Sequence, residues 1–70
     1  MSPSGGIALN GNKLRTLRQN AGHSIRSLAK EVGISYQMLG MVELGDRRAS
    51  PPVGKRIAEA LGVTLKEIRE

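Results

Sequence analysis

Apolar and polar positions along residues 24–45 follow the pattern of two short amphipathic helices separated by a glycine. Leu28 and Val32 are one helical turn apart, so they fall on the same side of the first helix. Gly33 tolerates the left-handed backbone conformation that ends many helices. Ser35 is a favoured N-cap, because its hydroxyl oxygen accepts a hydrogen bond from a free N–H of the next turn. Two capped helices joined by a glycine-containing turn predict a helix-turn-helix.

The second of these helices, residues 36–44, is predicted to have a buried side and a free side. Leu39 and Val42 form the buried side, so that the outer face holds Tyr36, Gln37, Gly40 and Met41. An α-helix fits the major groove of B-DNA, and the residues near its N-terminal end reach the base edges. We therefore expect these four residues to read DNA bases. For the tyrosine, a half-exposed cover over the core is the alternative.

Three further helices are predicted around this pair. Asn10 is a suitable N-cap for one that ends at Gly22, and Ser50, followed by two prolines, begins another that ends at Gly62. Thr64, with a glutamate three residues later, forms a capping box that opens a last short helix. No strand pattern is visible, so the sequence predicts an all-α fold, a compact bundle of five short helices.

The chain divides at residue 10 in this interpretation. Residues 1–9 are predicted to be a flexible N-terminal arm, because residues 1–6 have nothing to bury. Leu9 is expected to anchor the entry into the first helix. Residues 10–70 are predicted to form one domain. No effector domain follows it, so the chain is either self-contained or a fragment of a longer protein.

The charge of the chain favours a polyanionic partner. Eleven lysines and arginines against six acids give a net charge of +5. Residues 13–56 hold nine basic and three acidic residues, whereas residues 57–70 hold two and three. A basic body with a less basic end suits DNA on one side. Charge alone is equally compatible with a soluble basic protein that has no such partner.

The composition also argues against several classes of function. With no cysteine and a single histidine, we expect no disulfide, no metal site and no cofactor. Paired acids in an obvious pocket and a glycine-rich phosphate loop after a strand are missing too, so we expect no enzyme. No apolar run approaches the roughly 20 residues that cross a bilayer. We therefore expect a cytoplasmic protein with no membrane partner and no small-molecule ligand.

The ordered set of motif residues resembles the helix-turn-helix of the lambda-repressor-like Cro/cI family of phage and bacterial regulators. The similarity spans roughly residues 10–69, and only the full order is specific. Its positions are the run from Leu14 to Arg18 with Ala21 and Gly22, Ser24, Leu28 and Ala29, Val32, Gly33, Ile34 and Ser35, Val42, Glu43 and Gly45, Ile57 and Ala58, and Ala60, Leu61, Gly62 and Val63.

The resemblance implies a sequence-specific regulator of transcription that binds double-stranded DNA, of the repressor type, acting on a palindromic operator. A protein-binding helix-turn-helix, such as an antitoxin-like subunit, is the alternative. Leu44 and Asp46 favour the alternative, because family members commonly have asparagine and lysine there. Ile25 also departs from the family, which often has a glutamine that contacts phosphate.

The resemblance and the helix starts together suggest roles for six more residues. A partly buried bridge between Arg18 and Glu43 is implied by the family. Phosphate contacts are expected from Ser24 and Ser35 at helix N-termini, and from the two arginines that follow the second helix of the motif, Arg47 and Arg48.

The C-terminal region is the expected homodimer contact, as in the family. Its apolar residues are Val63, Leu65 and Ile68. They are numerous for a short terminal helix unless something covers them. Closure of the monomer's own core is the open alternative for each of them.

Overall fold

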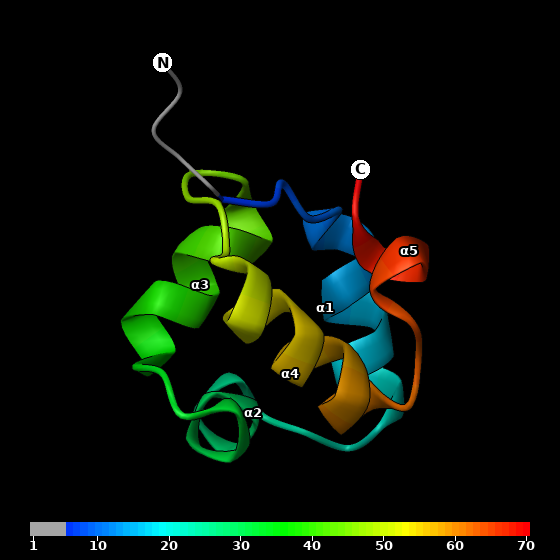
Figure 1. Cartoon of the computed structure of the whole chain (residues 1–70). Helices are drawn as coiled ribbons and strands as arrows, with labels where there is room; N and C mark the ends of the chain where they lie inside the picture. Colours follow the sequence, from blue (N-terminus) through cyan, green and yellow to red (C-terminus); the bar gives the residue numbers. More distant parts are fainter. Residues whose placement is uncertain (1–5) are drawn as a thin grey trace.

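Five α-helices make up the part of the chain that the structure, a computed structural model, describes, namely residues 6–70 (Figure 1). They are α1 (Gly11–Asn20), α2 (Ile25–Val32), α3 (Tyr36–Leu44), α4 (Pro51–Leu61) and α5 (Leu65–Ile68). The all-α prediction of five short helices is therefore confirmed. Residues 1–5 of the predicted arm lie outside the described residues. None of the helices within residues 6–70 combines the length and apolar character needed to cross a membrane.

The two helices of the motif begin and end at the predicted capping residues. The Ser24 hydroxyl oxygen accepts from the backbone N–H of Ser27 at 3.0 Å, which starts α2. The Ser35 hydroxyl oxygen accepts from the N–H of Met38 at 3.1 Å, which starts α3. Gly33 follows α2 with a φ of 88°, a left-handed conformation that favours glycine. Local sequence thus fixes where α3 begins.

The start of α4 differs from the other helix starts. Ser50 takes the N-cap position, as predicted, but its side chain makes no capping hydrogen bond. Pro51 and Pro52 follow it, and proline has no N–H to donate. Two of the backbone N–H groups that a cap would otherwise satisfy are therefore missing, and α4 begins without a side-chain capping hydrogen bond.

A single apolar core holds α3 by its inner side. Leu39 and Val42 of α3 are 0% and 1% exposed. They pack in one cluster with buried side chains of the other helices and of two loops: Leu9, Leu14, Leu28, Ala29, Val32, Ala49, Ile57, Ala58 and Ile68. Side chains in such cores interdigitate closely, which restricts movement of the elements that supply them. The outer face of α3 is therefore presented by a rigid support.

Ile68 belongs to this core, which corrects its predicted place in a homodimer contact. Its side chain is 0% exposed, so it has no surface to offer a second copy. Val63 and Leu65 are partly buried and pack against the same cluster. For Ile68 the alternative holds: it closes the monomer's own core.

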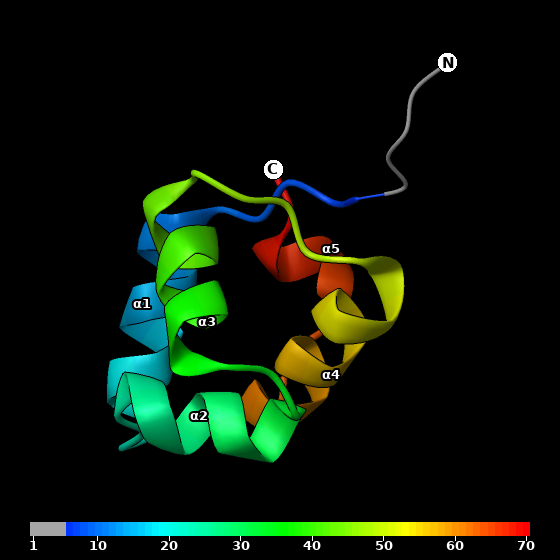
Figure 2. The same ribbon diagram turned by 90° about the vertical axis from the view of Figure 1, so that its left-hand side faces the viewer.

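Residues 7–9 differ from the flexible arm that we expected for residues 1–9. Ile7 and Ala49 exchange two backbone hydrogen bonds, of 2.6 and 3.0 Å. On the other side, Glu70 N–H donates to the Ala8 carbonyl at 2.9 Å, and Leu9 is only 4% exposed. The segment thus runs between the loop that follows α3 and the C-terminal residues (Figure 2). The division of the chain at residue 10 stays a prediction.

Side chains from near both ends of the described chain pack against Gly54 in α4. A Cβ atom at this buried glycine would lie 3.3 Å from Leu65 Cδ1 and 3.7 Å from Ile7 Cδ1. Glycine has no side chain to fill the space beside α4 at this position. The side chains of Ile7 and Leu65 occupy that space instead.

The capping box of α5 makes the stability of this helix depend on pH. Glu67 Oε2 accepts from the Thr64 N–H at 2.9 Å and from the Thr64 hydroxyl at 3.1 Å. These hydrogen bonds, the backbone one first, lower the pKa of the Glu67 carboxyl. A lowered pKa in the folded state means that the contribution is complete above the unfolded-state value of about 4.3 and is lost as the pH falls through the lower, folded-state value.

We therefore expect Glu67→Gln to destabilise the protein at pH 7 and to make a smaller difference at pH 3. Glutamine keeps the shape of the capping box, so the comparison isolates the charge. Urea unfolding of both proteins at the two pH values measures the difference. An equal difference at pH 7 and pH 3 would contradict the role of the carboxylate.

Candidate nucleic-acid interface

The outer face of α3 is exposed, and three of the four predicted base-reading residues lie on it. Tyr36 and Met41 are each 38% exposed, and Gln37 is exposed as well. The fourth, Gly40, is partly buried. Because the opposite side of the helix is anchored in the core, this face combines exposure with a fixed backbone. Figure 2 shows α3 at the front of the molecule.

Gly40 lies beside α2 rather than at the centre of the exposed face. A Cβ atom there would meet Ile25 Cδ1 at 3.5 Å, an ordinary van der Waals distance. Ile25 itself is partly buried and packs against the core. The isoleucine that departs from the family pattern therefore serves packing between α2 and α3.

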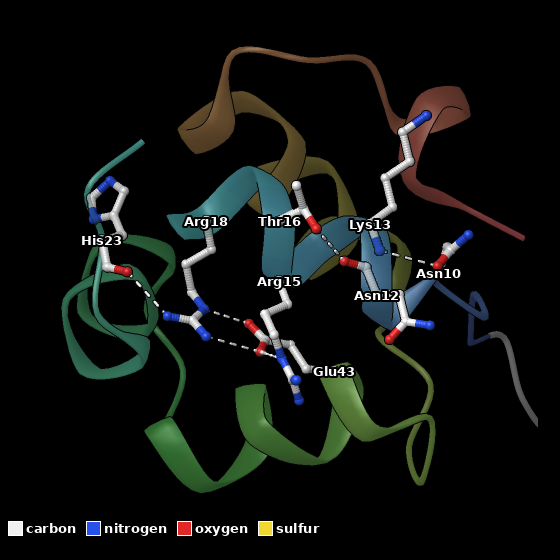
Figure 3. Close-up of polar contacts among 8 residues, drawn as sticks. All are labelled: Asn10, Asn12, Lys13, Arg15, Thr16, Arg18, His23 and Glu43. Carbon is white, nitrogen blue, oxygen red and sulfur yellow. Dashed lines mark hydrogen bonds and ion pairs between the residues drawn. The ribbon is translucent and has the colours of Figure 1, made fainter. Parts of the chain in front are cut away.

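The bridge between Arg18 and Glu43 is present and has a bidentate geometry (Figure 3). Arg18 Nε donates to Glu43 Oε2 at 2.6 Å, and Nη2 donates to Oε1 at 3.2 Å. Arg18 Nη1 also donates to the carbonyl of His23 at 3.0 Å. The guanidinium thus joins three elements: α1, the turn before α2, and the buried side of α3.

This bridge is well shielded from water. The side chains of Arg18 and Glu43 are 12% and 3% exposed. A second arginine of α1, Arg15, places its Nε 3.8 Å from Glu43 Oε1. Parallel N–H···O bonds of a guanidinium to a carboxylate fix the relative orientation of the two side chains. The bridge therefore sets how α3 is oriented on α1.

The predicted phosphate-binding residues surround the exposed face of α3. Arg47 and Arg48 follow the helix, are exposed, and form no ion pair with any acid of residues 6–70. Ser24 and Ser35 are exposed at the two helix N-termini, with their oxygens accepting the capping bonds described above. Each hydroxyl hydrogen is left to donate. These four residues and the free face of α3 are thus all accessible to a partner.

Two features of this surface were missed in the sequence. Arg26 Cζ lies 4.0 Å from the ring centroid of Tyr36, which links α2 to α3. Leu44 at the end of α3 is 68% exposed, the most exposed large apolar side chain of the described residues. Arg26 and Tyr36 are too far apart in sequence for a helical spacing rule to pair them.

Comparison with known proteins gives this arrangement its context. The family model described as Helix-turn-helix (HTH_3) matches residues 14–68, most of the chain. The chain belongs to this family. Membership confirms the predicted resemblance, since the family contains Cro/cI-like regulators.

Members of the family with similar sequences or structures are regulators of gene expression. The HTH-type transcriptional regulator YazB of Bacillus subtilis is 31% identical over 58 residues, which is 83% of this chain and 84% of YazB. The restriction-modification controller protein C.AhdI of Aeromonas hydrophila is 35% identical, with a TM-score of 0.77 over 81% of this chain and 86% of its own.

The clp gene regulator ClgR of Corynebacterium glutamicum is also similar, at 28% identity and a TM-score of 0.76. The match covers 81% of this chain but only 61% of ClgR. On the strength of its family, the protein is a DNA-binding transcriptional regulator of the helix-turn-helix type.

Proposed function

We propose that this helix-turn-helix regulator represses transcription by inserting α3 into the major groove of a palindromic operator, where it blocks a promoter. The observation that carries the proposal is the contrast between the two sides of α3. Leu39 is 0% exposed, whereas Tyr36 and Met41 are each 38% exposed. A helix held in this way can enter the groove without rearrangement of the domain.

Gln37 is the residue proposed to distinguish bases most strongly. Its carboxamide can donate to N7 and accept from the N6 amino group of adenine at the same time, a pairing specific to that base in the major groove. Met41, one turn further along α3, can cover a thymine methyl group. Gly40 carries no side chain and leaves the backbone there close to the surface, while the ring of Tyr36 extends the same face.

The contacts proposed to hold the DNA backbone lie at the two ends of α3 and at the N-terminus of α2. Arg47 and Arg48 would neutralise phosphates beside the groove. Ser24 and Ser35 would bind phosphate at the N-termini of α2 and α3, whose first turns contain no acidic residue. Such contacts fix position and make affinity fall with rising salt, but they do not select a sequence.

A palindromic operator requires two copies of the protein. We propose a symmetric homodimer through the C-terminal region, with Val63 and Leu65 as its remaining apolar candidates after the exclusion of Ile68. Both side chains are partly exposed on the same part of the molecule. A two-fold dimer would place its two α3 helices on successive turns of the major groove, roughly 34–36 Å apart.

The division of roles within the interface predicts different effects for Gln37→Ala and Arg48→Ala. We expect Gln37→Ala to weaken binding to the preferred site by about 1–3 kcal/mol and to relax base preference. Arg48→Ala should weaken binding to all DNA similarly and lower the salt slope by about 1.

Selection of bound sequences from a random DNA pool first identifies the preferred site. Affinities for that site and for an unrelated duplex are then measured at several salt concentrations. Lys55→Ala is the control, because Lys55 is an exposed basic residue of α4 that belongs neither to the proposed DNA contacts nor to the proposed dimer contact. Equal losses on both duplexes for Gln37→Ala would contradict its role as a base reader.

Leu44 is the observation that favours the alternative, a protein-binding helix-turn-helix. A leucine that is 68% exposed at the end of α3 offers apolar surface that a DNA phosphate would not use. The same selection tests this alternative. If the selection recovers no preferred sequence and any residual binding to DNA does not change with salt, a protein partner is favoured over DNA.

A further inference from the structure

Arg26 and Tyr36 form a stacked pair at the junction of α2 and α3. Arg26 lies in the first turn of α2, and Tyr36 is the first residue of α3. The guanidinium carbon lies 4.0 Å from the centroid of the ring, which is the distance of a cation–π contact. Both side chains remain exposed. The stack therefore lies on the accessible surface, next to the proposed base-reading face.

The position of Arg26 is electrostatically unfavourable in the free protein. The N-terminal end of a helix carries a partial positive charge, which repels a cation and attracts an anion. Neither α2 nor α3 has an acidic residue in its first turn. Within residues 6–70, no carboxylate forms an ion pair with Arg26 either. An incoming acceptor with negative charge would relieve this repulsion.

Stacking on a ring also leaves the hydrogen-bonding edge of a guanidinium available. The five N–H groups of arginine lie in the plane of the guanidinium, whereas the ring covers only one face of that plane. No hydrogen bond from Arg26 to another residue of the described chain uses these donors. The tyrosine thus restrains the side chain and leaves its donors free for two adjacent acceptor atoms.

We propose that Arg26 and Tyr36 act as one recognition unit, in which the ring positions the Arg26 guanidinium for a bidentate hydrogen bond to DNA. The acceptors are two atoms side by side, either two oxygens of one phosphate or O6 and N7 of a guanine. Arg26 makes the contact, and Tyr36 acts as its positioning residue. This inference rests on the proposed function and adds to it a contact from outside α3.

Lys30 provides a matched control for Arg26. It lies one helical turn further along α2, is exposed, and carries the same charge without an aromatic partner among the described residues. If Arg26 acted only through the overall charge of the domain, the two alanine substitutions would weaken binding equally. The comparison therefore separates a bidentate contact from general attraction.

The experiment measures affinity for the selected operator and for an unrelated duplex with five single variants and one double variant. The single variants are Arg26→Ala, Arg26→Lys, Lys30→Ala, Tyr36→Phe and Tyr36→Ala. We expect Arg26→Ala to weaken operator binding about tenfold more than Lys30→Ala. Arg26→Lys should resemble Arg26→Ala, because an ammonium cannot make the planar bidentate pair. Tyr36→Phe should lose less operator affinity than Arg26→Ala, since it keeps the stacked ring.

Tyr36→Ala should lose part of the same affinity, and the double variant with Arg26→Ala should be little weaker than Arg26→Ala alone. Such non-additivity is the signature of two residues that act together. Thermal unfolding of each variant confirms that the domain is folded, and Tyr36→Phe keeps the inference testable should Tyr36→Ala fail to fold.

The two possible acceptors are distinguished by the DNA. If the acceptor is a phosphate, Arg26→Ala weakens binding to the operator and to the unrelated duplex by the same factor. If the acceptor is a guanine, Arg26→Ala weakens only operator binding, and replacement of one operator guanine by 7-deazaguanine in the wild-type complex reproduces the loss. Either pattern supports the inference.

Equal effects of Arg26→Ala and Lys30→Ala, wild-type binding by Arg26→Lys, or fully additive losses for the double variant would overturn the recognition unit. In each of these cases the wild-type protein still selects an operator, so the proposed function stands. A wild-type protein that selects no DNA overturns both.

Discussion

Replacement of Glu43 by alanine is expected to lower the free energy of unfolding by about 3–5 kcal/mol, the range for removing one partner of a buried ion pair. The Arg18 guanidinium would keep only the His23 carbonyl as a protein acceptor while remaining largely buried. Domains of this size have total stabilities on the order of 3.5–10 kcal/mol. The variant should therefore be partly unfolded at room temperature, which urea titration followed by circular dichroism measures.

The control for this prediction is Glu31→Ala. Glu31 approaches His23 Nε2 at 3.4 Å, but its side chain is 56% exposed, so its loss should matter by less than about 1 kcal/mol. Replacing both members of the buried pair, Arg18→Met with Glu43→Leu, should be less harmful than Glu43→Ala, since neither charge is left without its partner. A double variant that is less stable than Glu43→Ala would contradict this account.

Opposite effects on the stability of the protein are expected from the same substitution at two glycines, Gly11→Ala and Gly40→Ala. A Cβ atom at Gly11 would lie 1.8 Å from the Glu43 carbonyl oxygen and 2.7 Å from its carbon. These are backbone atoms of α3, so α1 and α3 would have to separate. We expect Gly11→Ala to destabilise the protein by about 1–3 kcal/mol, as overpacking of a core does.

Gly40→Ala meets only the end of a flexible side chain, Ile25 Cδ1, at an ordinary contact distance of 3.5 Å. Alanine is preferred over glycine inside a helix by about 1 kcal/mol, so this variant should be more stable than the wild type. Thermal unfolding of the two variants tests the pair. A stabilising Gly11→Ala would show that α1 and α3 do not approach as closely as the structure indicates.

The helices and their ends were predictable because the information for them is local. Ser24 and Ser35 precede apolar stripes with helical spacing, and Gly33 stands where a helix must stop. Each of these needs only neighbours within one or two turns. The pairing of Arg18 with Glu43 came from the resemblance to a family, since nothing in their spacing along the chain brings them together.

The features that sequence did not reveal depend on contacts between distant segments. Ile7 pairs with Ala49, and Leu9 with Arg69, through backbone bonds that no side-chain pattern encodes. The sequence predicts Ile68 at a dimer surface, because a short terminal helix has little surface of its own to bury it. The N-terminal residues 7–9 complete the core around it, which the prediction of a flexible arm had left out.

The roles of individual residues in DNA recognition stay predictions. Exposure of Gln37 and Met41 follows from the spacing of the buried residues of α3, and it is necessary for base contacts. It is not sufficient, because solvation of a helix surface requires the same exposure. Only variants measured on matched and unmatched DNA separate the two roles.

The pairing of residues 8–10 with residues 68–70 bears on when this domain can fold during its synthesis. Asn10 N–H donates to the Ile68 carbonyl at 2.7 Å, and the Ile68 side chain closes the core. These partners of residues 8–10 are therefore still inside the ribosome when α1 to α4 have emerged. We infer that the nascent chain completes its native structure only after residues 68–70 have left the exit tunnel.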